Sequence, residues 1–430
     1  MRERGRGMRT VIVADDLTGA CDTAISMKPM DEHAYVCLQG LPRSHVGDEA
    51  GIWALNTNSR PLTASAAYDA VYQLVAKLRE QQRQGVSLYK KIDSLFRGNV
   101  TAELEAAAAA WKTPLVLLAP ATPSQGRRIL GGRLLASALN GGEMDLLPVL
   151  DAGGGSAFQN VSVEEVRRGE LFLAGYLRGL CQQGCSRLLV DGETQEDLEI
   201  TAKAVRALGD DVVLAGTSGF AAALRQTRAR ILPREEPTPT CVPPLIFVLG
   251  SCHTVTSTQC ARFLELPGTA AVWISAENCL REHDSQEVEA AYKQCEEFLQ
   301  AGVSALVLAT DSLKTGKREE FGDAGGNGEI SNKEITRTLG GVIRRLLPRH
   351  RFGAVVLSGG DTAYEILQSC GADGMELLCE LLPGIPLARI RPESGGELLV
   401  VTKSGSFGET ETFEQIYELL SKAGSKQEAI

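Results

Sequence analysis

Short apolar runs alternate with longer helix-like segments along almost the whole chain, and this alternation is the strongest guide to the fold. The run from Thr10 to Ala14 is β-branched and apolar without polar alternation, which is typical of a strand buried on both faces of a parallel sheet. The order of the segments predicts an α/β fold with mainly parallel sheets. Further strands are expected at 51–55, 86–92, 115–119, 187–191 and 212–216, with helices at 63–84, 99–110, 193–208 and 217–229.

A proline-rich segment, LPREEPTPTCVPP at 232–244, interrupts this alternation. Its five prolines and two adjacent acids can neither continue a helix nor pair in the middle of a sheet. A chain of 430 residues is also too long for one typical core. We therefore expect α/β domains at 1–231 and 245–430, with a cleft between them and 232–244 as linker and hinge. Strand-like runs resume at 245–251, 270–275, 304–310, 353–360 and 397–405.

The composition, 43% hydrophobic and 23% charged, is that of a globular protein. A net charge of −10 argues against a general nucleic-acid binder, and no apolar run is long enough to predict a membrane span. Eleven cysteines scattered through expected helices and strands, and a start without a signal-peptide core, favour the reducing cytoplasm. We expect a cytoplasmic protein without nucleic-acid or membrane partners, for which a homodimer is a reasonable prior.

Two adjacent carboxylates, Asp15 and Asp16, follow the first strand in the stretch VADDLTGACDTA. In open α/β sheets, ligands bind at the carboxyl ends of the strands. The residues from Thr18 to Ala20 can open a helix whose amide groups face the same crevice. Either aspartate could simply cap that helix, but one cap needs one carboxylate. We expect at least one of the pair to bind a ligand or a metal.

Two other loops add basic side chains to the same sheet edge. Arg60 ends the polar loop NTNSR, and arginine suits two-point recognition of a carboxylate, although a lone arginine is more often a surface residue. Gln125 and Arg127 follow a loop fixed by prolines, where ordinary loop polarity is the alternative.

The stretch YKKIDSLFRGNV at 89–100 crowds charged and polar side chains into the passage from strand to helix. Lys91 and Arg97 could hold negative charge while Asp93 and Ser94 address hydroxyl groups. The alternative is a solvated turn in which Asp93 or Ser94 caps the helix. Together these loops fit a small, hydroxylated acid as the ligand.

In the second half, SGGDTAYEIL at 358–367 follows a buried strand and begins a helix. Gly359 and Gly360 would let backbone amides approach a phosphate, and the helix N-terminus adds partial positive charge. Asp361 and Thr362 can cap the helix, or can bind Mg²⁺ or its waters.

Other glycine-rich turns accompany this one. LGS at 249–251 and KSGSFGE at 403–409 each follow a strand, and PGIP at 383–386 is a rigid turn. Several such turns at strand ends in one domain suggest a nucleotide phosphate pocket. The GxxxxGK[ST], GxGxxG and protein-kinase patterns are absent from the sequence.

These motifs together resemble the four-carbon acid sugar kinase family. The similarity runs in order through ADDLTGA, NTNSR, KKIDSLFRG, PATPSQGR, GS, SGGDTA, PGIP and KSGSFG, over nearly the whole chain. The resemblance implies an N-terminal acid-sugar-binding domain and a C-terminal nucleotide-binding domain. It also implies ATP- and Mg²⁺-dependent phosphorylation of threonate, erythronate or 3-oxo-tetronate at the terminal hydroxyl.

The candidate residues fall into three groups. Candidate substrate-binding residues are Asp16, Arg60, Lys90, Lys91, Asp93, Ser94, Arg97, Gln125 and Arg127. Candidate nucleotide-binding residues are Ser251, Ser358, Gly359, Gly360, Asp361, Thr362, Gly384, Lys403, Ser404, Gly405, Ser406, Phe407 and Gly408. Candidate catalytic residues are Asp15, Asp16 and Asp361, of which Asp361 is also the candidate metal ligand.

The identity of the base and of the substrate stays open. Asp16 would orient hydroxyl groups, while Asp15 would support the loop, bind Mg²⁺ or accept the proton, and Asp361 competes for the last role. The family commonly has Thr-Leu where this chain has Leu95-Phe96, which removes a hydroxyl and adds bulk. A kinase of another small hydroxy acid such as glycerate, or a non-catalytic ligand-binding relative, are the alternatives.

Overall fold

The computed structural model describes residues 9–29, 32–41, 50–81, 86–139, 141–152, 155–209, 211–226, 239, 241–250, 253–280, 284–315 and 327–421. The chain divides into two compact units, unit 1 at Met1–Arg234 and unit 2 at Glu235–Ile430. Both contain α-helices and mainly parallel strands, so the predicted fold class is confirmed. Of the predicted 232–244 linker, the structure describes only 239 and 241–244, and its role as a hinge stays a prediction.

Unit 1 is built, within the described residues, on eight parallel strands in the order β2-β3-β1-β4-β11-β5-β10-β9. Ile12, Leu117 and Leu189 in these strands have no exposed surface, as expected of apolar runs covered on both faces. The strands are β1 Arg9–Ala14, β2 His33–Cys37, β3 Ala50–Asn56, β4 Val86–Lys91, β5 Leu115–Ala119, β9 Gln159–Val161, β10 Arg187–Val190 and β11 Val212–Gly216.

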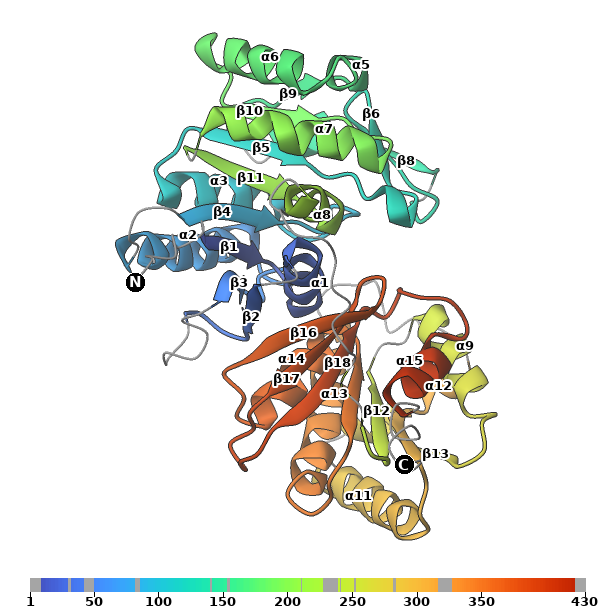
Figure 1. The fold of residues 1–430 in the computed structure, drawn as a ribbon. Helices are drawn as coiled ribbons and strands as arrows, with labels where there is room; N and C mark the ends of the chain where they lie inside the picture. Colours follow the sequence, from blue (N-terminus) through green and yellow to red (C-terminus); the bar gives the residue numbers. More distant parts are fainter. Residues whose placement is uncertain are drawn as a thin grey trace, which may run out of the picture. The chain divides into compact units, whose positions relative to one another are not determined.

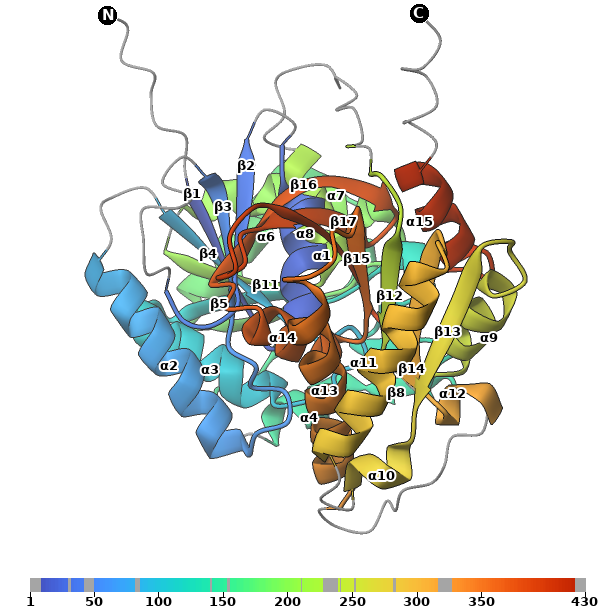
Figure 2. The same cartoon turned by 90° about the horizontal axis from the view of Figure 1, so that it is seen from below.

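Helices cover both faces of this sheet (Figure 1). On one face α1 packs against α8, α8 against α7, and α7 against α6; on the other, α2 lies alongside α3, as Figure 2 also shows. Their bounds are α1 Leu17–Met27, α2 Ala64–Gln81, α3 Val100–Trp111, α6 Glu170–Gln182, α7 Gln195–Val205 and α8 Ser218–Gln226. The four helices expected from the sequence are α2, α3, α7 with the 3-10 helix η2 Arg206–Leu208, and α8.

An antiparallel ribbon of short strands, which the sequence did not predict, follows β5 and the 3-10 helix η1 Pro123–Gln125. It consists of β6 Arg128–Leu130, β7 Arg133–Leu135 and β8 Glu143–Asp145, and the short helices α4 Leu146–Asp151 and α5 Val163–Val166 come after it. The Asp191 carboxylate accepts the amide groups of Gly131 at 2.6 Å and Gly132 at 3.0 Å, which anchors the ribbon to the main sheet. Strands of three residues are too short to show a period in the sequence.

The strand order places a topological switch point beside β1. The chain leaves β1 through α1 toward β2 on one side, whereas it leaves the neighbouring strand β4 through α3 toward β5 on the other. The two connections also cover opposite faces of the sheet. Such a parting of loops marks the edge at which open α/β sheets bind ligands, at the carboxyl ends of the strands, and we refer to this edge as the crevice of unit 1. Asp15 and Asp16 follow β1, and the Ile92–Ser94 loop follows β4.

Unit 2 is built, within the described residues, on seven strands in the order β13-β14-β12-β15-β18-β17-β16. The first five are mutually parallel, and β17 runs antiparallel to both of its neighbours. The strands are β12 Leu245–Leu249, β13 Thr269–Ile274, β14 Ala305–Thr310, β15 Ala354–Ser358, β16 Gly374–Leu382, β17 Ile385–Ile390 and β18 Leu398–Lys403.

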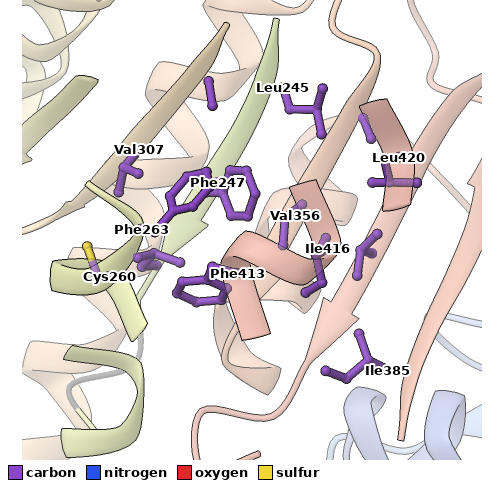
Figure 3. Close-up of a cluster of buried hydrophobic side chains, with 14 of the residues drawn as sticks. Leu245, Phe247, Cys260, Phe263, Val307, Val356, Ile385, Phe413, Ile416 and Leu420 are labelled. Carbon is purple, nitrogen blue, oxygen red and sulfur yellow. The ribbon is translucent and has the colours of Figure 1, made fainter. Parts of the chain in front are cut away.

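An aromatic cluster joins two helices to one face of this sheet (Figure 3). The ring centroid of Phe247 on β12 lies 4.4 Å from that of Phe263 on α9 and 5.6 Å from that of Phe413 on α15.

In the described parts of the chain no helix is both long and apolar enough to cross a membrane. The helices are α9 Thr254–Phe263, α10 Ala276–Leu280, α11 Asp284–Gln300, α12 Ser312–Thr315, α13 Asn327–Leu346, α14 Gly360–Ser369 and α15 Thr412–Ser421.

A second switch point lies between β12 and β15. The chain leaves β12 through α9 toward β13, and it leaves β15 through α14 toward β16 at the opposite end of the sheet. Gly250, which follows β12, therefore borders the same crevice as Ser358 and Gly359 at the end of β15. The amide of Gly250 donates to the Ser358 carbonyl at 3.3 Å.

Candidate functional site

Asp15 and Arg60 form a two-point ion pair at the crevice of unit 1. Arg60 Nε lies 2.8 Å from Asp15 Oδ2, and Arg60 Nη2 lies 3.0 Å from Asp15 Oδ1. Burial by itself would raise the pKa of the Asp15 carboxyl, but Arg60 and then Lys90 and Lys91 lower it overall. Asp15 is therefore a carboxylate held in its charged form, and it ties the loop after β1 to the loop after β3.

Asp16 caps helix α1 and contacts the same arginine. Its carboxylate accepts the Gly19 amide at 3.1 Å and the Thr18 hydroxyl at 2.5 Å, while Arg60 Nη2 lies 2.7 Å from its Oδ1. The side chain of Asp16 is 13% exposed, against 4% for that of Asp15. The capping role weighed from the sequence thus applies to Asp16, which is also the more accessible carboxylate of the pair.

Two glycines allow this close packing of charges. A Cβ atom on Gly19 would lie 2.4 Å from Asp16 Oδ1 and 3.0 Å from Lys91 Nζ. Gly98 has φ +81°, and a Cβ atom there would lie 3.1 Å from Arg60 Cγ. At Gly19 the Asp16 carboxylate occupies the space a Cβ would fill, and at Gly98 the positive φ favours glycine.

Asp93 organises the loop that follows β4. Its carboxylate accepts the Arg97 side chain at 2.9 and 2.7 Å and the amides of Leu95 and Arg97 at 3.1 and 3.2 Å. Burial would raise the pKa of Asp93, but the bonds from Arg97 and the charge of Arg60 bring it well below its usual range. Phe96 adopts φ +60° in this loop, a strained conformation for an aromatic residue. Its side chain is buried.

The two lysines at the end of β4 have different surroundings. Lys90 has no exposed surface, and its Nζ lies 2.7 Å from Glu103 Oε2 on α3. It also donates to the Lys91 carbonyl at 2.7 Å. Lys91 donates to the Ile92 carbonyl at 2.8 Å and lies next to Gly19 at the crevice. The geometry therefore favours a supporting role for Lys90. Lys91 is also buried, but it forms no ion pair within the described residues, so its charge is left to pair with a ligand next to Gly19.

The loop after β5 reaches the same group of side chains. Arg127 Nη1 donates to the Ser94 hydroxyl, and burial lowers the pKa of Arg127, which Asp93 partly opposes. The amide oxygen of Gln125 is buried and has no hydrogen-bond partner among the described residues. A ligand hydroxyl could satisfy such an acceptor.

Two residues of this region, Glu103 and Asp22, were not predicted from the sequence. Glu103 neutralises Lys90 and accepts the Ser59 hydroxyl at 2.6 Å, and a glutamate inside the alanine-rich run of α3 is the signal that could have found it. Asp22 on α1 raises the pKa of Arg127 against the effect of burial, and its position among small residues of α1 is a comparable signal.

The crevice of unit 1 is therefore lined by fixed charges of both signs. Carboxylates can accept hydroxyl groups, and Lys91 with the arginines can hold an anion. The carboxylates already hold the arginines in place, so a ligand would meet side chains that lose little freedom on binding. Such a surface suits a small polyhydroxylated acid.

In unit 2 the turn between β15 and α14 adjoins the second switch point. Gly359 has φ +110°, which favours glycine, and its amide donates to the Lys403 carbonyl at 2.9 Å. Ser358 and Thr362 are buried, and a Cβ atom on Gly250 would lie 2.0 Å from Thr362 Oγ1. The turn and the end of β12 are thus in direct contact. The predicted residue Ser251 lies outside the described residues.

Asp361 is exposed in the first turn of α14, immediately after the paired glycines. Magnesium in phosphoryl-transfer sites is usually held by one or two carboxylates together with phosphate oxygens. An exposed carboxylate at a turn of this kind fits that mode. Among the described residues no group of three or more His, Cys, Asp or Glu side chains could hold a metal.

The turn after β18 lies next to the one after β15, because these strands are parallel neighbours. Lys403 is 1% exposed and donates to the carbonyls of Ser404 at 2.8 Å and Phe407 at 3.0 Å. The register of β17 against β18 places the turn holding Gly384, with φ +72°, at this same edge.

Unit 2 therefore gathers three glycine-containing turns at one edge of its sheet. The first turn of α14 supplies amide groups without helical partners, and these carry partial positive charge. Backbone amides in a crevice of this kind favour phosphate. Of the predicted nucleotide-binding residues, those at 358–362, Gly384 and 403–408 lie at this edge.

Two family models match the chain and together cover most of it. The one described as a sugar-binding N-terminal domain matches residues 10–149 and 137–224. The one described as a nucleotide-binding C-terminal domain matches residues 246–413.

Similar proteins cover nearly the whole chain. A D-threonate kinase of Salmonella typhimurium is 27% identical over 94% of this chain and 96% of its own length. A 3-oxo-tetronate kinase of Actinobacillus succinogenes is 24% identical over 94% of this chain and 97% of its own. The crystal structure of Haemophilus influenzae protein HI1011 has the same fold, with a TM-score of 0.69 at 20% identity over 94% of this chain and 98% of that one.

Proposed function

The chain belongs to the four-carbon acid sugar kinase family, and on that premise we propose that it transfers the γ-phosphoryl group of ATP to a four-carbon acid sugar. The acceptor is the terminal hydroxyl of threonate, erythronate or 3-oxo-tetronate. Unit 1 binds the acid sugar and unit 2 binds the nucleotide.

The observation that carries this proposal is the charged cluster at the first switch point. Arg60 contacts Asp15 and Asp16 at 2.7–3.0 Å, and its Nη2 also lies 3.6 Å from Asp93 Oδ1. Loops after three neighbouring strands thus meet at one guanidinium. An acid sugar needs both hydroxyl acceptors and a cation for its carboxylate, and this crevice presents both.

The nucleotide half of the proposal is supported by the turns of unit 2. The turn at Gly359 and Gly360 opens helix α14, and the turn at 404–408 lies beside it. Asp361 would hold Mg²⁺ together with the phosphates. Bound there, Mg²⁺ would supply positive charge that offsets the negative charge developing during phosphoryl transfer.

The three candidate carboxylates have different suitability as a proton acceptor. Asp15 is a poor base, because Arg60 lowers its pKa and both of its oxygens are engaged. We therefore assign Asp15 to holding Arg60 and Asp16 to orienting the substrate hydroxyls. Asp361 would act at the phosphates. Phosphoryl transfer depends mainly on positioning and charge neutralisation, so these roles carry more of the rate than a base does.

The first test is ADP release by the full-length protein with ATP, Mg²⁺ and a panel of acids. Threonate, erythronate and 3-oxo-tetronate are compared with glycerate, and ³¹P NMR locates the phosphate on the product. We expect one four-carbon acid to exceed glycerate by at least about tenfold in kcat/KM, the effect of about 1.4 kcal/mol. Release with glycerate alone would point to a three-carbon acid kinase, and no release with any acid would point to a ligand-binding protein.

Two matched substitutions then separate the halves. Asp16→Asn should mainly raise KM for the acid, and Asp361→Asn should mainly lower kcat with little change in KM for the acid. Asp69→Asn changes an exposed aspartate of α2 in the same way and should leave both constants unchanged. A loss of kcat with Asp16→Asn at constant KM would instead make Asp16 the base.

The partners in this proposal are small molecules, the acid sugar and the nucleotide. The cytoplasm supplies ATP and is the compartment that the proposal requires. The homodimer expected from the sequence stays a prediction.

A further inference from the structure

Lys403 is a buried cation whose hydrogen bonds go only to backbone carbonyls. Its Nζ donates to Ser404 O and Phe407 O, and it lies 5.3 Å from the centre of the Phe413 ring. No ion pair within the described residues includes this lysine. Buried ammonium groups are costly without a partner, so its position in the fold calls for an explanation.

Two further side chains bind the same turn from within the domain. The Thr256 hydroxyl of α9 donates to Gly405 O at 2.8 Å, and the Gln259 amide donates to Phe407 O at 2.9 Å and Glu409 O at 2.8 Å. Thr256 and Gln259 have no exposed surface. Interior donors thus occupy the carbonyls at 404, 405, 407 and 409.

This arrangement determines where the amide groups of the turn point. In a trans peptide the C=O of one residue and the N–H of the next point in opposite directions. Carbonyls of 404, 405 and 407 that face inward therefore turn the amides of Gly405, Ser406 and Gly408 outward. Consistent with this, none of these three amides donates a hydrogen bond within the described part of the chain.

We propose that Lys403 is a positioning residue of the nucleotide site, which together with Thr256 and Gln259 holds the 404–409 turn so that its amides bind phosphate. Outward amide groups of consecutive residues form an anion-binding concavity. The inference rests on the proposed function, because it assigns the phosphates of the nucleotide to these amides.

A direct contact between Lys403 and phosphate is the competing assignment. Lys403 is 1% exposed, whereas Ser406 and Gly408 are exposed. Two hydrogen bonds of the ammonium group already go to carbonyls of the turn. Burial lowers the pKa of Lys403 to about 7, so at neutral pH only part of the protein molecules carry this charge. The geometry assigns the contact to the backbone and the support to the lysine.

The test measures ATP dissociation constants by calorimetry and both KM values for full-length variants. Thr256→Val keeps the shape of the residue and removes the donor to Gly405 O, together with the longer 3.4 Å contact of that hydroxyl to the Ser358 hydroxyl. Lys403→Met removes the central donor, and Lys403→Arg restores donors at the same place. Thr201→Val is the matched control, since Thr201 is equally buried and donates to the Asp197 carbonyl at 2.9 Å in unit 1.

We expect Lys403→Met to weaken ATP binding by about tenfold or more and Thr256→Val by about threefold, within the range of lost hydrogen bonds. Lys403→Arg should recover part of the loss, while KM for the acid and the Thr201→Val variant stay unchanged. If Lys403→Met does not fold, Thr256→Val alone decides. Unchanged ATP affinity in folded Thr256→Val overturns the positioning role, whatever Lys403→Met does. Wild-type protein that binds no ATP would instead overturn the proposed function.

Discussion

Replacing Lys90 by methionine should destabilise unit 1 without weakening the binding of the acid. Lys90 Nζ lies 2.7 Å from Glu103 Oε2, and the two side chains are 0% and 2% exposed. At an effective dielectric constant of about 20, that separation corresponds to an attraction of about 6 kcal/mol before desolvation is subtracted. Desolvation of both ions cancels most of this attraction, so the intact pair makes only a small net contribution to the free energy of unfolding.

Lys90→Met does more than remove the small net contribution of the ion pair. It leaves the Glu103 carboxylate buried, with the Ser59 hydroxyl at 2.6 Å as its remaining partner. An uncompensated buried charge costs about 3–5 kcal/mol, and we expect the free energy of unfolding to fall by that amount. In the double variant Lys90→Met with Glu103→Gln the charge is absent and Ser59 keeps a partner, so most of the loss should be recovered.

Urea unfolding followed by tryptophan fluorescence measures these changes. A Trp273→Phe background removes the tryptophan of β13 and leaves Trp53 of β3 and Trp111 of α3 as reporters of unit 1. A loss below about 1 kcal/mol in Lys90→Met, or no recovery in the double variant, would refute the electrostatic reasoning. A rise of more than about tenfold in KM for the acid in the folded double variant would make Lys90 a substrate ligand.

Three further outcomes follow from the described contacts. Arg60→Lys should lower the free energy of unfolding by about 1.5–3 kcal/mol, because lysine cannot reproduce the two-point bond to Asp15, and urea unfolding measures this. Gly19→Ala should lower the melting temperature although alanine favours helices by about 1 kcal/mol, since its Cβ would lie 2.4 Å from Asp16 Oδ1; a higher melting temperature would contradict the clash. Folding lowers the pKa of Lys403 from 10.5 to about 7, so between these values the unfolded chain binds the extra proton. The stability of the wild type relative to Lys403→Met should therefore rise with pH by about 1.4 kcal/mol per unit, and equal slopes in urea titrations at pH 7 to 9 would contradict the shift.

The parallel sheets could be predicted because their strands carry a local signal. Runs such as 115–119 are apolar throughout, and burial on both faces demands this composition. The ribbon at 128–145 could not be predicted, because its strands have three residues each and Asp191, a residue distant in sequence, anchors its turn. Likewise β16 and β17 were not among the expected strands, because Glu376, Glu380 and Arg389 interrupt their apolar pattern, and nothing in their own sequence gives the antiparallel direction of β17.

The sequence indicated which loops meet at each crevice. It was less informative about the role of each side chain there. Asp15, Arg60 and Asp93 could be grouped because they follow strands whose carboxyl ends share an edge. The difference between Lys90 and Lys91 was hidden, since successive residues of a strand point to opposite faces and only the position of Glu103 on α3 decides which lysine forms an ion pair. For Lys403 the sequence predicts a nucleotide contact, whereas its hydrogen bonds to two carbonyls of its own turn, which no local pattern reveals, support the positioning role that we propose.

Each sheet has its own switch point, one at β1 and β4 and the other at β12 and β15. The scaffold that shapes one crevice shares no strand with the scaffold that shapes the other. Substitutions that retune the first for a new acid need not disturb phosphate recognition by the second. Recombination at the proline-rich segment could thus join unit 1 of one protein to unit 2 of another. The preference for the phosphoryl acceptor could then diverge while the phosphoryl donor stays the same.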